Sequence, residues 1–230
     1  PKALDALVTE VGWLKNALGD TACSILSSKA VAEETGSPDF VGGMLNTHGG
    51  IIHPLNFARG MARGLNAAGI AVFEDSPVTG IRNDPQNVRV ETPDGLVIAQ
   101  QVVIATNSYS DLTPVGDSVR KSIIPFRSAM IATERLAETL EKSLLAQDRS
   151  YTETRRMMRW FRKADGRMIY GGRGAFGKTD SQAAFEALHK AMMRQFPVLS
   201  DVKISHQWSG LVAMTLDSIP HVGRLDDRVI

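Results

Sequence analysis

The stretch PLNFARGMARGLNAAGIAVFED, residues 54–75, decides the fold class of this chain. Pro54 stands at the first position of a predicted helix, where the missing N–H of proline costs no hydrogen bond. Gly69 ends this helix, and its apolar stripe consists of Ala58, Met61, Ala62 and Leu65. The run IAVFED, residues 70–75, predicts a buried strand. A helix followed directly by an apolar strand is typical of an α/β fold.

The segment that follows has the pattern of an antiparallel meander. Turn signals separate short alternating runs at residues 78–82, 87–92 and 95–99. These signals are Asp84-Pro85 and Pro93-Asp94-Gly95. The next run, Val102–Ala105, is apolar without interruption, which predicts a strand of a parallel sheet that is buried on both faces. The order of elements predicts an α/β fold of mixed, α+β character.

Regular elements are predicted on both sides of this region. Apolar residues at helical spacing predict a helix over residues 4–18, which ends at Gly19, and a polar segment then runs to Gly36. Longer strands are predicted at residues 122–136, 158–172 and 202–215. Helices are predicted near residues 135–145 and 181–195.

Composition argues against several classes of partner. The net charge of the 230 residues is +1, so neither nucleic acid nor an anionic membrane is implied as a partner. The basic stretch at residues 155–163 alternates with apolar residues, which predicts a strand with one solvent-exposed face. Cys23 is the only cysteine, which excludes an internal disulfide and fits a reducing compartment. The histidines lack metal-ligand spacing, so we assign no metal. No apolar run approaches the length of a membrane span and no secretion signal is present, so we expect a cytoplasmic protein.

One motif favours a different class. GRGAFGKT, Gly172–Thr179, matches the phosphate-binding pattern G-x-x-x-x-G-K-T. We expect Thr179 to be the N-cap of the next helix, with Gln182 completing a capping box, and this leaves Lys178 outside the helix. The strand that ends at Thr106 also lacks the acidic residue that holds Mg²⁺. A P-loop nucleotide-binding protein therefore stays the alternative hypothesis.

Three further segments point to a family. Residues 49–81, 102–110 and 208–223 resemble the middle and end of FAD-dependent amine oxidoreductases of the D-amino-acid oxidase and glycine oxidase superfamily, and γ-glutamylputrescine oxidoreductases above all. The resemblance implies FAD as cofactor and the oxidation of a small amine or amino acid to an imine. It also implies part of a FAD/NAD(P)-binding domain interleaved with a mixed-sheet substrate domain.

The resemblance implies a division of the chain into four parts. Residues 1–53 would form a helical segment and the start of the substrate domain, and residues 54–115 part of the FAD domain. Residues 116–216 would continue the substrate domain, and residues 217–230 would return to the FAD domain. The first βαβ unit of the family, with its G-x-G-x-x-G, would precede residue 1.

The resemblance also implies residues that bind the cofactor. The residue matching Val78 meets the adenine through its backbone. Ala105-Thr106-Asn107 matches the family's A-T-G, with Asn, a residue that tolerates a left-handed backbone, in place of Gly. The final D-x-x-P-x-x-G and the strand leading to it supply Gly210, Asp217, Pro220 and Gly223.

Three residues are candidates for the substrate pocket. Arg173 is suited to pair with a substrate carboxylate, because guanidinium groups bind carboxylates in bidentate fashion. A solvated surface arginine is the alternative. Trp208 would line the pocket or belong to the core. His48 lies in the glycine-rich segment expected near the flavin, whereas His53 is expected to cap the helix that starts at Pro54.

The same resemblance predicts that this chain is a fragment. We expect it to be inactive alone and to expose apolar edges that favour self-association. A catalytically silent binding domain derived from the oxidase fold is a third hypothesis. It predicts that an amine is bound without turnover.

Overall fold

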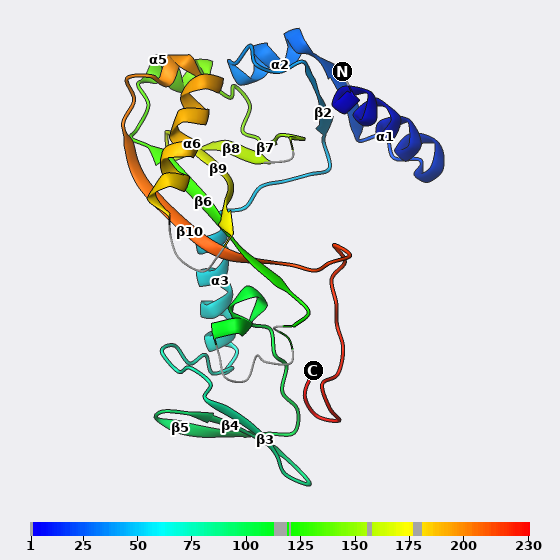
Figure 1. The fold of residues 1–230 in the computed structure, drawn as a ribbon, viewed down its shortest axis with the longest axis vertical. Coiled ribbons are helices and arrows are strands. Elements are labelled where there is room, and N and C mark those ends of the chain that lie inside the picture. Colours follow the sequence, from blue (N-terminus) through cyan, green and yellow to red (C-terminus); the bar gives the residue numbers. More distant parts are fainter. Residues whose placement is uncertain (1, 113–118, 120, 156–157, 177–180) are drawn as a thin grey trace. The chain divides into compact units, whose positions relative to one another are not determined.

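The computed structural model describes residues 2–112, 119, 121–155, 158–176 and 181–230. The chain divides into two compact units. Unit 1 comprises Pro1–Ile52, Ser128–Ala175 and Asp180–Ser209, and unit 2 comprises His53–Arg127, Phe176–Thr179 and Gly210–Ile230. Figure 1 follows the path of the chain through helices and sheets, and the mixed α/β class predicted from the sequence is confirmed.

Unit 1 begins with a helix and a small sheet. α1 (Lys2–Leu18) precedes β1 (Cys23–Ser27), which pairs antiparallel with β2 (Gly42–Asn46). Between these strands lies α2 (Ser28–Thr35). The predicted helix over residues 4–18 is confirmed, whereas the polar segment expected before Gly36 in fact contains β1 and α2.

The short helix α2 is defined by its ends. Ser27 Oγ accepts a hydrogen bond from the N–H of Ala30 at 3.2 Å, which satisfies one of the free donors of the first turn. Gly36 follows the last turn with φ 73°, and its N–H donates to Ala32 O at 2.8 Å. Caps at both ends stabilise a helix that is too short and too polar to be recognised by periodicity.

The main sheet has five strands in the order β10-β6-β9-β8-β7. They are β6 (Ile124–Thr133), β7 (Tyr151–Thr152), β8 (Arg159–Ala164), β9 (Arg167–Phe176) and β10 (Ile204–Met214). β8 and β9 form a hairpin in which Phe161 pairs with Tyr170. Its turn residues, Asp165 and Gly166, both have positive φ, which matches the right-handed twist of the two strands. The longer strands predicted at residues 122–136 and 202–215 are confirmed as β6 and β10. The single strand predicted at residues 158–172 is wrong, because the turn at Asp165-Gly166 divides this segment into β8 and β9.

Helices complete unit 1. They are α5 (Glu138–Ser143), α6 (Gln182–Gln195) and the 3-10 helix η3 (Pro197–Leu199). α6 covers one face of the sheet with Phe185, Leu188 and Met192 (Figure 1). The capping box predicted for this helix is wrong, because α6 begins at Gln182 with Ser181 at the N-cap position. Lys178 and Thr179 lie outside the described residues.

The core of unit 1 is centred on Phe161. Its ring contacts four other aromatic rings, with centroid distances of 5.9 Å to Phe40, 5.3 Å to Tyr151, 5.8 Å to Tyr170 and 5.3 Å to Phe196. The side chain is 3% exposed. Phe161 therefore joins β7, β9 and the end of α6 to the segment that follows α2.

Unit 2 contains the predicted helix and meander. α3 (Pro54–Ala67) begins at the proline as expected, and His53 Nδ1 accepts from the N–H of Asn56 at 3.3 Å. The meander consists of β3 (Gly80–Asn83), β4 (Val88–Thr92) and β5 (Gly95–Ala99), paired antiparallel in that order. The 3-10 helix η1 (Asn107–Leu112) follows. Both predictions, and the cap by His53, are confirmed.

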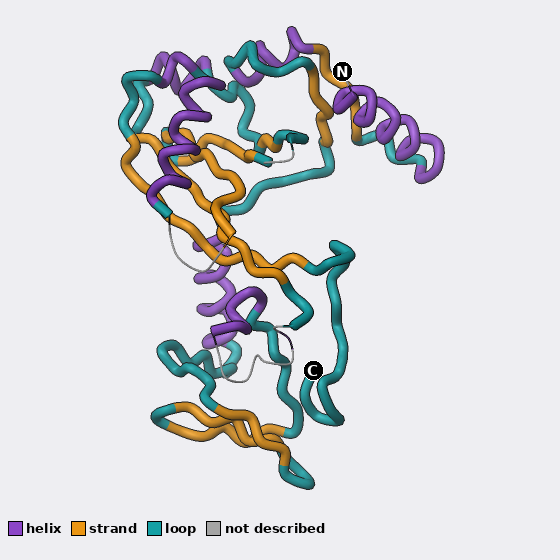
Figure 2. Tube along the Cα trace, viewed as in Figure 1, coloured by secondary structure: helices purple, strands orange, loops and turns teal. Residues whose placement is uncertain are grey.

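Two predicted parallel strands are corrected. Residues 70–75 form no strand, and Phe73 is 72% exposed; Figure 2 shows loop between α3 and β3. Val102–Ala105 is not buried on both faces, because Val103 is 67% exposed. A strand buried on both faces belongs to a sheet that other elements cover on both sides. Within the described residues the first segment pairs with no strand, and the second pairs with one segment only.

The described part of the chain contains no helix with the length and apolar character needed to cross a membrane.

Candidate cofactor-binding site

A short parallel pairing in unit 2 precedes a tight turn. The N–H of Val102 donates to Arg228 O at 2.9 Å, the N–H of Ile230 to Val102 O at 2.9 Å, and the N–H of Ile104 to Ile230 O at 2.7 Å. The turn at Ala105–Ser110 begins directly after Ile104, at the carboxyl end of the paired segments 102–104 and 228–230. In open α/β sheets, ligands bind at the carboxyl ends of the strands.

Side-chain hydrogen bonds build this turn. Asn107 has φ 50°, and its Oδ1 accepts from the N–H of Ser108 at 2.7 Å. The hydroxyls of Thr106 and Ser110 are 2.6 Å apart, and Ser110 Oγ donates to Asn107 O at 2.7 Å. Asparagine is one of the few residues that adopt this left-handed conformation readily. Asn107 therefore holds this left-handed backbone without being a glycine.

Sequence reasoning missed two residues of this turn. The side chain of Ser108 is 0% exposed, and its Oγ has no hydrogen-bond partner among the described residues. Tyr109 Oη lies 4.0 Å from the position that a Cβ on Gly210 would take. The only signal in the sequence is the density of hydroxyl side chains in TNSYS, residues 106–110. Gly210, a predicted cofactor residue, thus lies beside the turn that contains Ala105, Thr106 and Asn107.

Val78 lies in the segment just before β3. The N–H of Thr79 donates to Glu91 O at 2.8 Å, which anchors this segment to β4. Within the described residues, no hydrogen bond is made by the backbone of Val78 itself. Its N–H and C=O are thus available for a ligand, as its predicted role requires.

The segment after β10 forms a turn around Asp217. The carboxylate accepts a hydrogen bond from the N–H of Ile219 at 3.1 Å. Each of its two oxygens, Oδ1 and Oδ2, lies 3.1 Å from His221 Nε2. Ser218 has φ 60°. Asp217, Pro220 and Gly223 are all exposed. Asp217 therefore holds the turn in its conformation, which is a positioning role.

We expect His221→Ala to raise the pKa of Asp217. The hydrogen bond from His221, followed by that from Ile219, lowers this pKa from 3.8 to about 2. Because the folded pKa is lowered, the stabilisation from this carboxylate is present above pH 3.8 and is lost as the pH falls through about 2. The variant should shift the titration of the Asp217 carboxyl carbon, followed by NMR, back toward 3.8.

Asp226 is the matched control for this titration. Backbone N–H groups of Arg228 and Val229 lower its pKa, and His221 is not among the causes. Its titration should be the same in both proteins. An Asp217 midpoint that does not move would contradict the role assigned to His221.

The three pocket candidates belong to unit 1. His48 is exposed, and its backbone N–H donates to Asn46 Oδ1 at 2.8 Å. Arg173 is half-buried on β9. Trp208, on β10, is 43% exposed. By contrast, every predicted cofactor residue belongs to unit 2.

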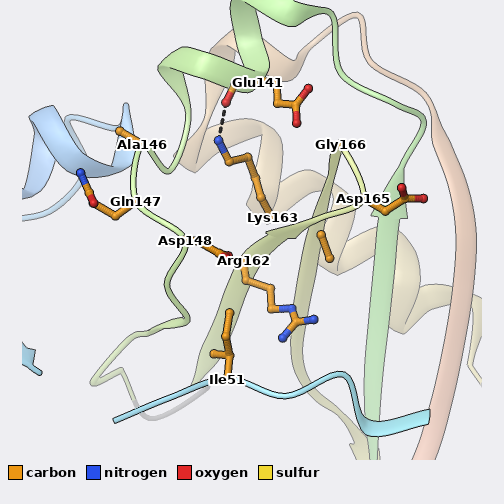
Figure 3. A pocket seen from close by; sticks show the side chains of 10 residues that line it. Ile51, Glu141, Ala146, Gln147, Asp148, Arg162, Lys163, Asp165 and Gly166 are labelled. Atoms are coloured by element: carbon orange, nitrogen blue, oxygen red, sulfur yellow. Dashed lines mark hydrogen bonds between the residues drawn. The ribbon is translucent and has the colours of Figure 1, made fainter. Parts of the chain in front are cut away.

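Figure 3 shows a cavity of unit 1 that contains none of these candidates. It has a volume of about 410 Å³ and lies beside α5 and the β8–β9 turn. Lys163 Nζ donates to Glu141 O, and Arg162 Nη1 donates to Ile52 O at 2.9 Å. Both cations are thus bound to backbone carbonyls, which favours a structural role for them.

These features define a mixed α/β protein in which a tight turn follows a short parallel pairing of Val102–Ile104 with Arg228–Ile230. The chain belongs to the FAD dependent oxidoreductase family (DAO), whose family model matches residues 1–230. The predicted resemblance is confirmed.

Relatives with curated names agree with this assignment. A probable oxidoreductase OrdL of Haemophilus influenzae is 34% identical over 86% of this chain and 46% of its own length. The gamma-glutamylputrescine oxidoreductase of Escherichia coli K12 is 33% identical over 92% of this chain and 49% of its own length. The chain thus spans about half the length of these relatives.

Solved structures support the fold. The crystal structure of glycine oxidase from Geobacillus kaustophilus superposes with a TM-score of 0.78 at 19% identity, over 97% of this chain and 59% of that one. At this identity the likeness concerns the fold alone.

The residues of unit 2 fit the cofactor of the family. FAD carries an adenine and many oxygen atoms, and the unit offers it the free backbone of Val78, a left-handed turn at Asn107 and the unpaired hydroxyl of Ser108. A buried hydroxyl without a partner costs about 1–3 kcal/mol. Such a group is therefore expected to find a partner in the functional state.

Proposed function

We propose that this chain is part of a FAD-dependent oxidoreductase that oxidises an amine or amino acid of the γ-glutamylputrescine type to an imine. The observation that carries the proposal is the turn at Ala105–Ser110, at the carboxyl end of the parallel pair. The similarity to the gamma-glutamylputrescine oxidoreductase of Escherichia coli supports the choice of substrate.

We assign the cofactor to unit 2. In this proposal Val78 contacts the adenine through its backbone, and Ala105, Thr106, Asn107 and Gly210 form the wall that the cofactor approaches. Asp217, Pro220 and Gly223 bring the chain to the flavin. The division into residues 1–53, 54–115, 116–216 and 217–230 belongs to the same proposal, and the two compact units are compatible with it.

We assign the substrate to unit 1. Arg173 binds a substrate carboxylate, while His48 and Trp208 line the pocket. When bound, FAD supplies the two-electron acceptor for the carbon–nitrogen bond. The residues of the chain then have to position the substrate and exclude water, a task that needs few charged groups.

Two further assignments belong to the proposal. We place the protein in the cytoplasm. We also expect the chain to self-associate when it is produced alone, because apolar side chains of unit 2 are exposed: Leu55, Phe57, Met61, Leu96, Val97 and Ile98.

The test is the flavin content and reactivity of the full-length protein. We expect the purified protein to release FAD on denaturation, and its visible flavin absorption to bleach under anaerobic conditions when γ-glutamylputrescine is added. Putrescine, which lacks the carboxylate, should bleach it more slowly, and Arg173→Ala should reduce this difference. A protein without flavin would sink the proposal. If none of the added amines bleaches the flavin, the proposed substrate class is wrong, whereas the assignment of FAD stands.

A further inference from the structure

Ser108 differs from the other hydroxyl residues of its turn. Thr106 and Ser110 are bonded to each other, and Ser110 also bonds to the backbone. Ser108 is fully buried, and its Oγ has no partner among the described residues. Buried hydroxyls in folded proteins are almost always paired. The described residues thus supply no hydrogen-bond partner for the hydroxyl of Ser108.

Among the described residues, one further buried side-chain atom lacks a hydrogen bond, and it has a different explanation. Glu153 Oε2 lies 3.6 Å from Arg155 Nε and 3.8 Å from Arg159 Nη1. Its charge is therefore balanced by the chain itself. For Ser108 the described residues provide no comparable group.

The position of Ser108 indicates where its partner comes from. The residue follows the left-handed Asn107 in the turn at the carboxyl end of the parallel pair, and its neighbour Tyr109 lies beside Gly210. Ligands of α/β sheets bind at this end of the strands. The unpaired hydroxyl thus lies in the part of unit 2 to which we assign the cofactor.

We propose that Ser108 Oγ is a cofactor-binding group that hydrogen-bonds an oxygen atom of FAD, either in its ribityl chain or in its phosphates. This inference rests on the proposed function. Because the hydroxyl has no exposed surface, the turn has to shift when FAD binds. An unpaired hydroxyl destabilises the closed turn, so this shift costs less than it would in a fully bonded turn.

The test compares two serine variants of the full-length protein. We expect Ser108→Ala to weaken FAD binding about tenfold, which is the effect of one lost hydrogen bond, as measured by quenching of flavin fluorescence. Without FAD, its midpoint of urea unfolding should equal or exceed that of the wild type, because no existing bond is removed. Ser110→Ala should lower this midpoint, since its hydroxyl is bonded twice.

Two probes distinguish the oxygen atoms. A loss of affinity for ADP points to the phosphates, and a loss for riboflavin points to the ribityl chain; either result supports the proposal. Ser108→Cys, which keeps the volume but is a weak donor, replaces the alanine variant if that variant does not fold.

Two outcomes would overturn the inference alone. One is unchanged FAD affinity in Ser108→Ala, and the other is a fall in its urea midpoint as large as that of Ser110→Ala, because this would show a partner within the chain. A wild-type protein that binds no FAD would overturn the proposed function and this inference together.

Discussion

Phe161→Ala is expected to lower the free energy of unfolding of unit 1 by about 3–5 kcal/mol, the usual cost of truncating a buried phenylalanine. The side chain is 3% exposed, and its ring contacts Phe40, Tyr151, Tyr170 and Phe196. Aromatic pairs add to the burial term. Because these partners come from four separate segments, the cavity cannot be closed by moving one of them.

Urea unfolding followed by tryptophan fluorescence measures this loss. All three tryptophans, Trp13, Trp160 and Trp208, belong to unit 1, so the signal reports on that unit. Phe73→Ala is the matched control, because this phenylalanine is 72% exposed in unit 2 and its loss should change the midpoint little. Equal midpoints for the two variants would show that Phe161 is not the centre of the core.

Local patterns were sufficient where partners are close in sequence. The meander β3–β4–β5 pairs neighbours across short turns, which Asp84-Pro85 and Pro93-Asp94-Gly95 mark in the sequence. A similar signal, Asp165-Gly166, marks the hairpin β8–β9, which the prediction of one strand over residues 158–172 missed. Likewise α3 begins at Pro54, where the proline starts the helix and His53 caps it. In each case the residues that decide the structure lie within one or two turns of the chain.

Sequence patterns failed where the partner is remote. The apolar run at residues 70–75 has the composition of a buried strand, but composition does not supply the neighbouring strands that would bury it. Val102–Ile104 finds one neighbour, Arg228–Ile230, more than a hundred residues away. The short helix α2 was missed for another reason, since its stability lies in its caps at Ser27 and Gly36 rather than in an apolar stripe.

The candidate site shows the same limit. The resemblance of Ala105-Thr106-Asn107 to the family's A-T-G indicated a cofactor-binding segment in which Asn107 tolerates a left-handed backbone, and the structure adds the turn that this segment forms. No pattern indicated that Ser108 is buried without a partner while Ser110 is bonded, because both are serines in the same turn. The difference between them arises only when the chain closes the turn, so it is a property of packing.

Gly36→Ala is expected to destabilise unit 1 by about 2–4 kcal/mol, because two costs add. Gly36 has φ 73°, a left-handed conformation that costs an alanine about 1–2 kcal/mol. A Cβ at this position would lie 2.8 Å from Ser143 O and 3.0 Å from Leu144 Cδ2. The carbonyl belongs to the backbone, and Leu144 is fully buried, so neither atom can move without disturbing the end of α5.

Gly19→Ala separates the two costs. Gly19 follows α1 with φ 65°, and among the described residues no atom beyond those of its two chain neighbours lies within 4 Å of the position that an alanine Cβ would take. Its replacement therefore carries the conformational cost alone. Urea unfolding should therefore show a loss of about 1–2 kcal/mol for Gly19→Ala and a clearly larger one for Gly36→Ala. The difference between the two losses measures how strongly the residues at the end of α5 resist displacement by the added methyl group. If the two losses are equal, Ser143 and Leu144 yield to the methyl group, and the contact between α2 and α5 is looser than its distances indicate.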